Sequence, residues 1–186
     1  MTCVLDPELN PDDTALFYHI YRRASEYLAT RGHLPPMAFF RAGVLPRLPT
    51  LKPGQVAMLE IEMPGNDTGK DCVAEMLRQF ARRADADLVI LVLESWMIKP
   101  NAEEARYIQR SGRFQVRPSQ HPQRIEIVFI SVSKPGGQNW SAWIEISRDA
   151  CGRPSIPADP PSLEYLTADG RFANILDGNG NLPSRS

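Results

Sequence analysis

The sequence contains few cysteines, and none of them are close together. Its 186 residues include only Cys3, Cys72 and Cys151, which form no Cys-x-x-Cys pair. An odd number of distant cysteines argues against a disulfide framework and against a structural zinc site. We therefore expect free thiols, with Cys72 on a helix, and a fold stabilised by a hydrophobic core.

Long apolar runs and net charge are also lacking. No segment reaches the roughly 18 consecutive apolar residues of a membrane-spanning helix, and the first ten residues lack the basic start and apolar centre of a signal peptide. The net charge of −1 gives no overall attraction to nucleic acid or to an anionic membrane. We therefore expect a cytoplasmic protein without membrane contact, in which nucleic-acid binding would need a local basic patch.

The common catalytic and cofactor-binding signatures are absent as well. The sequence has no Gly-x-Ser-x-Gly, no phosphate-binding loop, no Gly-x-Gly-x-x-Gly after a strand and no His-Glu-x-x-His. Ser95 follows a strand pattern but lacks the flanking glycines of a nucleophile elbow. No cofactor is predicted.

The most informative stretch that is present is Asp87–Ile98. Six apolar residues run unbroken from Leu88 to Leu93, and a short run rich in branched aliphatic residues is typical of a strand buried on both faces. A buried helix is the alternative, but polar residues close both ends of the run. We interpret the stretch as the central strand of the sheet.

The patterns around this strand predict an α+β fold. Apolar residues at three- and four-residue spacing indicate one helix from Pro11 to Gly32 and another over roughly residues 69–84. Gln55–Met63 alternates like a strand, and strand, helix and central strand in this order suggest a βαβ unit with parallel neighbouring strands. Met37–Phe40 could be a loop or a short strand.

A β-hairpin is predicted next, from Arg124–Lys134 and Trp140–Arg148. Gly136 and Gly137 suit a two-residue turn, which would set the register of the two strands. That register places the following residues opposite one another: Phe129 and Ile144, Ile127 and Ile146, Ser131 and Ala142, and Ile130 and Trp143. The prediction is a single mixed sheet of about four strands, with two main helices packed on one face.

The remaining segments complete the expected organisation. Lys99–Gln123 is a long connection in which a capping box at Asn101 predicts a short helix over Ala102–Arg110. Residues 1–155 should form one domain. Residues 156–186 should form an extension, partly docked and partly disordered, because proline, glycine and serine are frequent there.

Four short segments carry a resemblance to other proteins. They are Gly32-His-Leu-Pro-Pro-Met37, Glu94-Ser-Trp-Met97, His121-Pro-Gln-Arg-Ile-Glu126 and Ile146-Ser-Arg-Asp-Ala-Cys-Gly-Arg-Pro154. The chain resembles, over roughly residues 11–155, a loose group of small uncharacterised bacterial and phage proteins of unknown function. The resemblance implies a bacterial or phage origin, and it implies no catalytic residue.

Acidic residues form the first candidate site. If Gln55–Met63 and Asp87–Ile98 were parallel neighbours, Glu60, Glu62 and Glu94 would meet at the carboxyl edge of the sheet, where open α/β sheets bind ligands. Such carboxylates could bind Mg²⁺ or Mn²⁺ or perform acid–base catalysis, and His121 could join them. Structural carboxylates facing water or arginine are the alternative.

Basic and aromatic residues form the second candidate site. Arg106, Arg110, Arg113 and Arg117 recur at helical spacing, although Gly112 interrupts the helix, and they could bind phosphates or acidic side chains or merely be solvated. Trp140 and Trp143 point to opposite faces of their strand. One of them could therefore be exposed and anchor an interface, whereas burial of all three tryptophans is the alternative.

We interpret the sequence as that of a protein-interaction protein rather than an enzyme. The expected contact surface is the Lys99–Gln123 connection together with the exposed side of the hairpin, with Arg106, Arg110, Arg113, Arg117 and Trp143 as binding residues. A divalent-metal enzyme using Glu60, Glu62 and Glu94 is the alternative, and nucleic-acid binding through the arginines is a third possibility.

Overall fold

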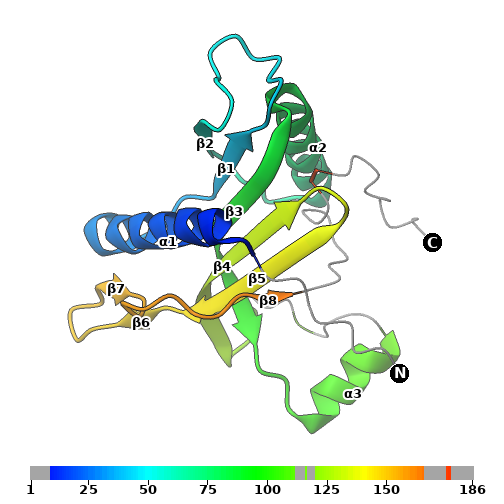
Figure 1. The fold of residues 1–186 in the computed structure, drawn as a ribbon. Coiled ribbons are helices and arrows are strands. Elements are labelled where there is room, and N and C mark those ends of the chain that lie inside the picture. Colours follow the sequence, from blue (N-terminus) through cyan, green and yellow to red (C-terminus); the bar gives the residue numbers. More distant parts are fainter. Residues whose placement is uncertain (1–8, 112–115, 117–119, 166–174, 177–186) are drawn as a thin grey trace, which may run out of the picture.

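A computed structural model describes residues 9–111, 116, 120–165 and 175–176 (Figure 1). It contains three helices: α1 (Pro11–Arg31), α2 (Asp67–Ala84) and α3 (Ala102–Ser111). The strands are β1 (Met37–Ala42), β2 (Val56–Glu60), β3 (Ala86–Ile98), β4 (Arg124–Lys134), β5 (Gln138–Glu145), β6 (Ser147–Arg148), β7 (Pro154–Ser155) and β8 (Glu164–Tyr165). None of the described helices is long and apolar enough to cross a membrane.

The main sheet has six strands in the order β2-β1-β3-β4-β5-β8, and every neighbouring pair is antiparallel. The prediction of a mixed, four-stranded sheet was therefore wrong, although the α+β class is right. A separate two-stranded sheet joins β6 to β7. β2 and β3 do run parallel to each other, but β1 lies between them, so the expected neighbouring βαβ pair is split.

β1 separates β2 from β3. It contains Met37–Phe40, the segment for which the sequence allowed either a loop or a short strand. Met37, Ala38, Phe39 and Phe40 are all buried, because β1 has a strand on each edge and side-chain layers on both faces. Four consecutive apolar residues suit that place. Pro35 and Pro36 give no amide hydrogens, and β1 begins at the residue that follows them.

The two long helices lie on opposite faces of the sheet (Figure 1). Phe17, Ile20 and Leu28 of α1 share one apolar core with Ile90 of β3. Leu77 and Ala81 of α2 share a second core with the neighbouring residues of the same strand, Val89 and Leu91. The expectation of helices on one face was wrong, because alternate residues of β3 are apolar on both sides and each side needs a cover.

An asparagine directly before each of these two helices caps its first turn. The Asn10 side chain accepts a hydrogen bond from the Asp13 amide at 2.8 Å, and Asn66 accepts one from the Gly69 amide at 2.6 Å. Asparagine satisfies amides that have no partner inside the helix. Gly32 ends α1 with φ 77°, as its sequence position predicts.

The predicted hairpin is confirmed, but its register differs by one residue. Lys134 pairs with Gln138, so the loop is Pro135-Gly136-Gly137 rather than two residues. Both glycines have positive φ, 81° and 73°, which only glycine adopts easily. The one-residue change alters every partner: Phe129 faces Trp143, Ile127 faces Glu145, Ser131 faces Ser141, and Ile130 faces Ala142.

Parts of the C-terminal region pack against this domain. Tyr165 of β8 pairs with Trp140 of β5, and their rings meet edge to face at 5.6 Å. Ile175 is 1% exposed and belongs to the core beneath α2. The disorder predicted for part of residues 156–186 was expected at 177–186, which lie outside the described part.

A buried ionic cluster ties α1 to the sheet. The Asp13 side chain is fully buried and accepts hydrogen bonds from Arg41 Nη1 at 2.7 Å and from Lys134 Nζ at 2.6 Å. Arg41 also donates from Nε to Asp87 at 2.7 Å. The guanidinium is mostly buried, and its hydrogen bonds to Asp87 and Asp13 raise the pKa of Arg41 despite that burial. Residues from α1, β1, β3 and β4 thus share one network.

Candidate functional site

Four segments, residues 32–37, 94–97, 121–126 and 146–154, meet at one end of the sheet. Leu34, after α1, donates its amide hydrogen to Glu94 Oε1 of β3 at 2.7 Å. The Ile146 amide donates to the Glu126 carbonyl of β4 at 2.9 Å. This end, formed by the C-terminal half of β3 and the N-terminal half of β4, is the candidate site because residues as far apart in the sequence as Leu34 and Glu94 are joined there.

An arginine stacks on a partly exposed tryptophan at this end of the sheet. Arg124 begins β4, and its guanidinium carbon lies 4.7 Å from the centroid of the Trp96 ring. Trp96 pairs with Glu126 of β4. Arg124 lies two residues before Glu126, so its side chain points to the same face of the sheet as those of Glu126 and Trp96. Trp96 is 36% exposed, so part of a large aromatic side chain remains open to a partner.

A salt bridge borders this stack. Arg148 Nε donates to Glu126 Oε2 at 2.8 Å, and Arg148 Nη1 donates to the Gly152 carbonyl at 3.2 Å. The hydrogen bond to Glu126 is the main cause that raises the pKa of Arg148, and the charge of Glu94 adds to it. We define the Trp96 surface as Trp96, Arg124, Glu126 and Arg148.

Next to this surface, His121 fastens α3 to the rest of the protein. Its Nδ1 accepts the Gln123 amide hydrogen at 3.1 Å, so Nε2 carries the ring hydrogen and donates to Glu104 Oε1 at 2.9 Å. The other Glu104 oxygen accepts the Asn101 amide, completing the predicted capping box. These bonds, the Asn101 amide first and His121 second, lower the pKa of Glu104.

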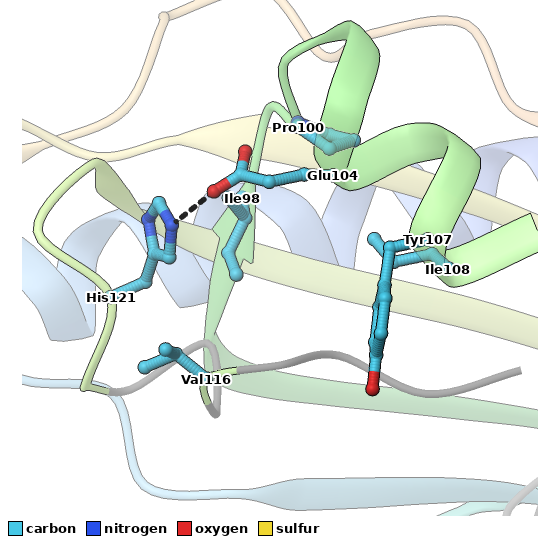
Figure 2. Close-up of a pocket in the computed structure, with 7 residues that line it drawn as sticks. All are labelled: Ile98, Pro100, Glu104, Tyr107, Ile108, Val116 and His121. Atoms are coloured by element: carbon cyan, nitrogen blue, oxygen red, sulfur yellow. Dashed lines mark hydrogen bonds and ion pairs between the residues drawn. The ribbon is translucent and has the colours of Figure 1, made fainter. Parts of the chain in front are cut away.

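A shallow hollow surrounds this bond, and Figure 2 shows the His121 ring facing the Glu104 carboxylate across it. The lining residues are mostly apolar: Ile98, Pro100, Glu104, Tyr107, Ile108, Val116 and His121. Helix α3 has no buried residue and lies beyond the end of β3 (Figure 1). Its attachment to the described part of the chain therefore depends on this small contact.

We expect His121→Ala to loosen α3 at neutral pH. The variant removes the side chain that bonds Glu104 but leaves the Asn101 cap intact, so the helix should open more often. Hydrogen exchange read by mass spectrometry should show several-fold faster exchange over Ala102–Ser111. His33→Ala, at an exposed histidine, is the matched control. Equal exchange in both variants would show that the His121 bond does not hold α3.

Acid should loosen the same helix. The pKa of Glu104 is lower in the folded protein than in the unfolded chain. The ionised Glu104 therefore stabilises the folded state at any pH above the unfolded pKa of about 4.3. This stabilisation is lost as the pH falls through the folded pKa. After correction for intrinsic rates, exchange over α3 should therefore rise below about pH 4. Unchanged protection at that pH would contradict the assignment.

The predicted acidic site does not assemble. Glu60 and Glu62 are exposed at the end of β2, whereas Glu94 accepts the Leu34 amide on β3. Since β1 separates these strands, the backbones that carry the two groups lie roughly 10 Å apart. His121 joins Glu104 instead. Among the described residues, no group of three or more His, Cys, Asp or Glu side chains could hold a metal ion.

The predicted binding residues are spread over the molecule. Arg106 and Arg110 are exposed on α3, while Arg113 and Arg117 lie outside the described residues. Trp143 is 54% exposed on β5 and faces Phe129 of β4. Both side chains lie on the same face of the sheet as α2, which covers β1 and β3 rather than β5. Trp140 is buried, so the opposite-face prediction for these two tryptophans is confirmed, and burial of all three is excluded.

Sequence reasoning missed the Trp96 surface. Trp96, Arg124 and Arg148 come from three strands, and none of the three was a candidate. The signal available in the sequence was the two-residue alternation of strands. It places Glu94 and Trp96 on one face of β3, and it places Arg124 and Glu126 on one face of β4. Only the pairing of β3 with β4 shows that those two faces are the same.

Comparisons with known proteins give no relatives. No protein-family model, no curated protein and no solved structure matches this chain.

Proposed function

We propose that this chain is a protein-binding protein whose contact surface is the Trp96 surface. The observation that carries the proposal is the partly exposed side chain of Trp96 with the Arg124 guanidinium stacked on it. Tryptophan and arginine are the side chains that most often supply the binding energy of protein interfaces. Trp96 also lies directly before the Lys99–Gln123 connection from which binding was expected.

The charges of this surface support a protein partner over nucleic acid. Glu126 pairs with Arg148, and Glu94 adds a second carboxylate near the same arginine. A phosphate backbone would meet these acids together with the arginines, which weakens the attraction that nucleic-acid binding needs. A partner that offers its own apolar and charged groups can match both signs.

The surface is also held in place before binding. Trp96 lies on a thirteen-residue strand and is paired there with Glu126 of β4, while the first part of the same strand is also paired with β1. Glu126 is in turn fixed by Arg148. Side chains that are already ordered lose less conformational entropy on association. The geometry therefore favours direct docking over folding upon binding.

We expect Trp96→Ala to weaken partner binding by roughly 30-fold, the loss of about 2 kcal/mol that defines an interface hot spot. The partner is first captured on the tagged wild-type chain, after nuclease treatment, and its affinity for each variant is then measured by calorimetry. Trp143→Ala is the matched control, because Trp143 is also exposed but lies on the opposite face of the sheet.

Three further outcomes bear on the proposal. Loss of binding in Trp143→Ala with full binding in Trp96→Ala would overturn it and point to the other face. Loss only in the Arg106→Glu, Arg110→Glu double variant would overturn it in favour of α3. Capture that disappears on nuclease treatment would replace a protein partner with nucleic acid.

A further inference from the structure

The sheet ends at β2, the outermost described strand on that side. Val56 and Met58 are 37% and 49% exposed, because the core beneath α1 includes residues of β1, β3, β4 and β5 but none of β2. The five residues Val56-Ala-Met-Leu-Glu60 include neither proline nor lysine. Those are the residues that proteins commonly use to keep an edge strand from pairing with another chain.

The hydrogen-bond pattern shows which backbone groups of β2 point outward. The Ile61 amide donates to the Pro36 carbonyl, and the Gln55 carbonyl accepts from the Ala42 amide. Bonded residues alternate along an antiparallel strand, so odd-numbered residues of β2 face β1. The amide and carbonyl groups of Val56, Met58 and Glu60 therefore face away from the sheet.

We propose that this edge pairs with the same edge of a second copy of the chain, antiparallel about Met58. In that register Met58 lies opposite Met58 of the second copy, and Val56 lies opposite Glu60. Every outward-facing residue then meets another outward-facing residue, which gives about six interchain backbone hydrogen bonds. The two sheets become one continuous sheet across a two-fold axis.

The side chains fit the same register on both faces. On one face, the two Met58 side chains pack together beside Val56. On the other face, Ala57 lies opposite Leu59 of the second copy, a small side chain against a large one. Cross-strand apolar pairs of this kind stabilise antiparallel sheets.

The flanking charges favour this antiparallel arrangement. Lys52 precedes β2, whereas Glu60 and Glu62 lie at or just after its end, and all three residues are exposed. Antiparallel pairing brings the basic start of one strand toward the acidic end of the other. A parallel arrangement would place the acids of both copies side by side, where like charges repel.

Sedimentation equilibrium of the full chain tests the proposal. An interface built on five residues per copy is at the small end of specific contacts, so measurements should extend to about 1 mM. We expect reversible dimerisation in this range. Met58→Lys should give a monomer, because it places two ammonium groups opposite each other. Met76→Lys, at a similarly exposed methionine of α2, should leave the dimer unchanged.

A charge-swapped pair tests the register itself. Met58→Lys and Met58→Glu should each be monomeric alone, and an equal mixture should form a one-to-one dimer. A wild-type chain that stays monomeric at every concentration up to about 1 mM would overturn the proposal. In that case the partner of this edge would be a strand of another protein. A dimer that survives in Met58→Lys, or a mixture that stays monomeric, would likewise overturn it.

Discussion

Asp13→Asn is expected to lower the melting temperature by about 10 °C. The Asp13 carboxylate is fully buried and accepts hydrogen bonds from both Arg41 and Lys134. Asparagine keeps the shape but removes the charge, so two cations remain close together without the anion between them. Breaking a buried ion pair costs about 3 kcal/mol or more, and each kcal/mol lowers the melting temperature of a chain this size by about 2–4 °C.

Thermal unfolding followed by circular dichroism measures the effect. Asp12→Asn is the control, since Asp12 lies in the same first turn of α1 but is exposed, and it should melt within about 2 °C of the wild type. A similar melting temperature for Asp13→Asn would mean that the cluster adds little net stability.

Gly43→Ala is expected to destabilise the protein by about 2–3 kcal/mol. The Gly43 amide donates to the Asp85 carbonyl at 2.9 Å, and a Cβ added to Gly43 would lie 2.1 Å from that oxygen. The obstacle is backbone rather than a flexible side chain. Asp85 cannot move easily, because it ends α2 with φ 49° and its carboxylate accepts the Leu45 amide.

Urea unfolding of Gly43→Ala and Gly65→Ala separates this contact from the general effect of removing a glycine. A Cβ at Gly65 would meet no atom within 4 Å, and its φ is not positive. Gly65→Ala should therefore be neutral or slightly stabilising, by up to about 1 kcal/mol. Equal stability of the two variants would show that the loop after β1 can move away from α2.

The two glycines also show the limit of sequence reasoning about loops. Proline and glycine are frequent between Leu34 and Gly54, a composition typical of irregular chain, and residues 43–55 form no helix or strand. The same composition concealed β1, whose six residues have no alternation because both of their faces are buried. Alternation identifies a strand with one exposed face, and β1 has none.

Strand order had a direct effect on the candidate site. The acidic site assumed that the strand at Gln55–Met63 and the strand at Asp87–Ile98 are neighbours, and β1 between them separates Glu60 from Glu94. The hairpin register depended on loop length, and one additional loop residue placed Trp143 beside Phe129. The first error came from a pairing between distant segments and the second from the length of a single turn, and the periodicity of one strand reports neither.

By itself, the sequence determined the local elements of this protein: helical stripes that end at Gly32 and Ala84, a capping box at Asn101, a strand at Leu88–Leu93 and a hairpin after Arg124. These follow from side-chain spacing and backbone preferences within a few residues. Only the tertiary structure decided that β1 enters between β2 and β3, that the helices cover opposite faces, and that Arg124 stacks on Trp96. The physical reason is that strand pairing and packing join residues far apart in the chain, so many arrangements satisfy the same local pattern.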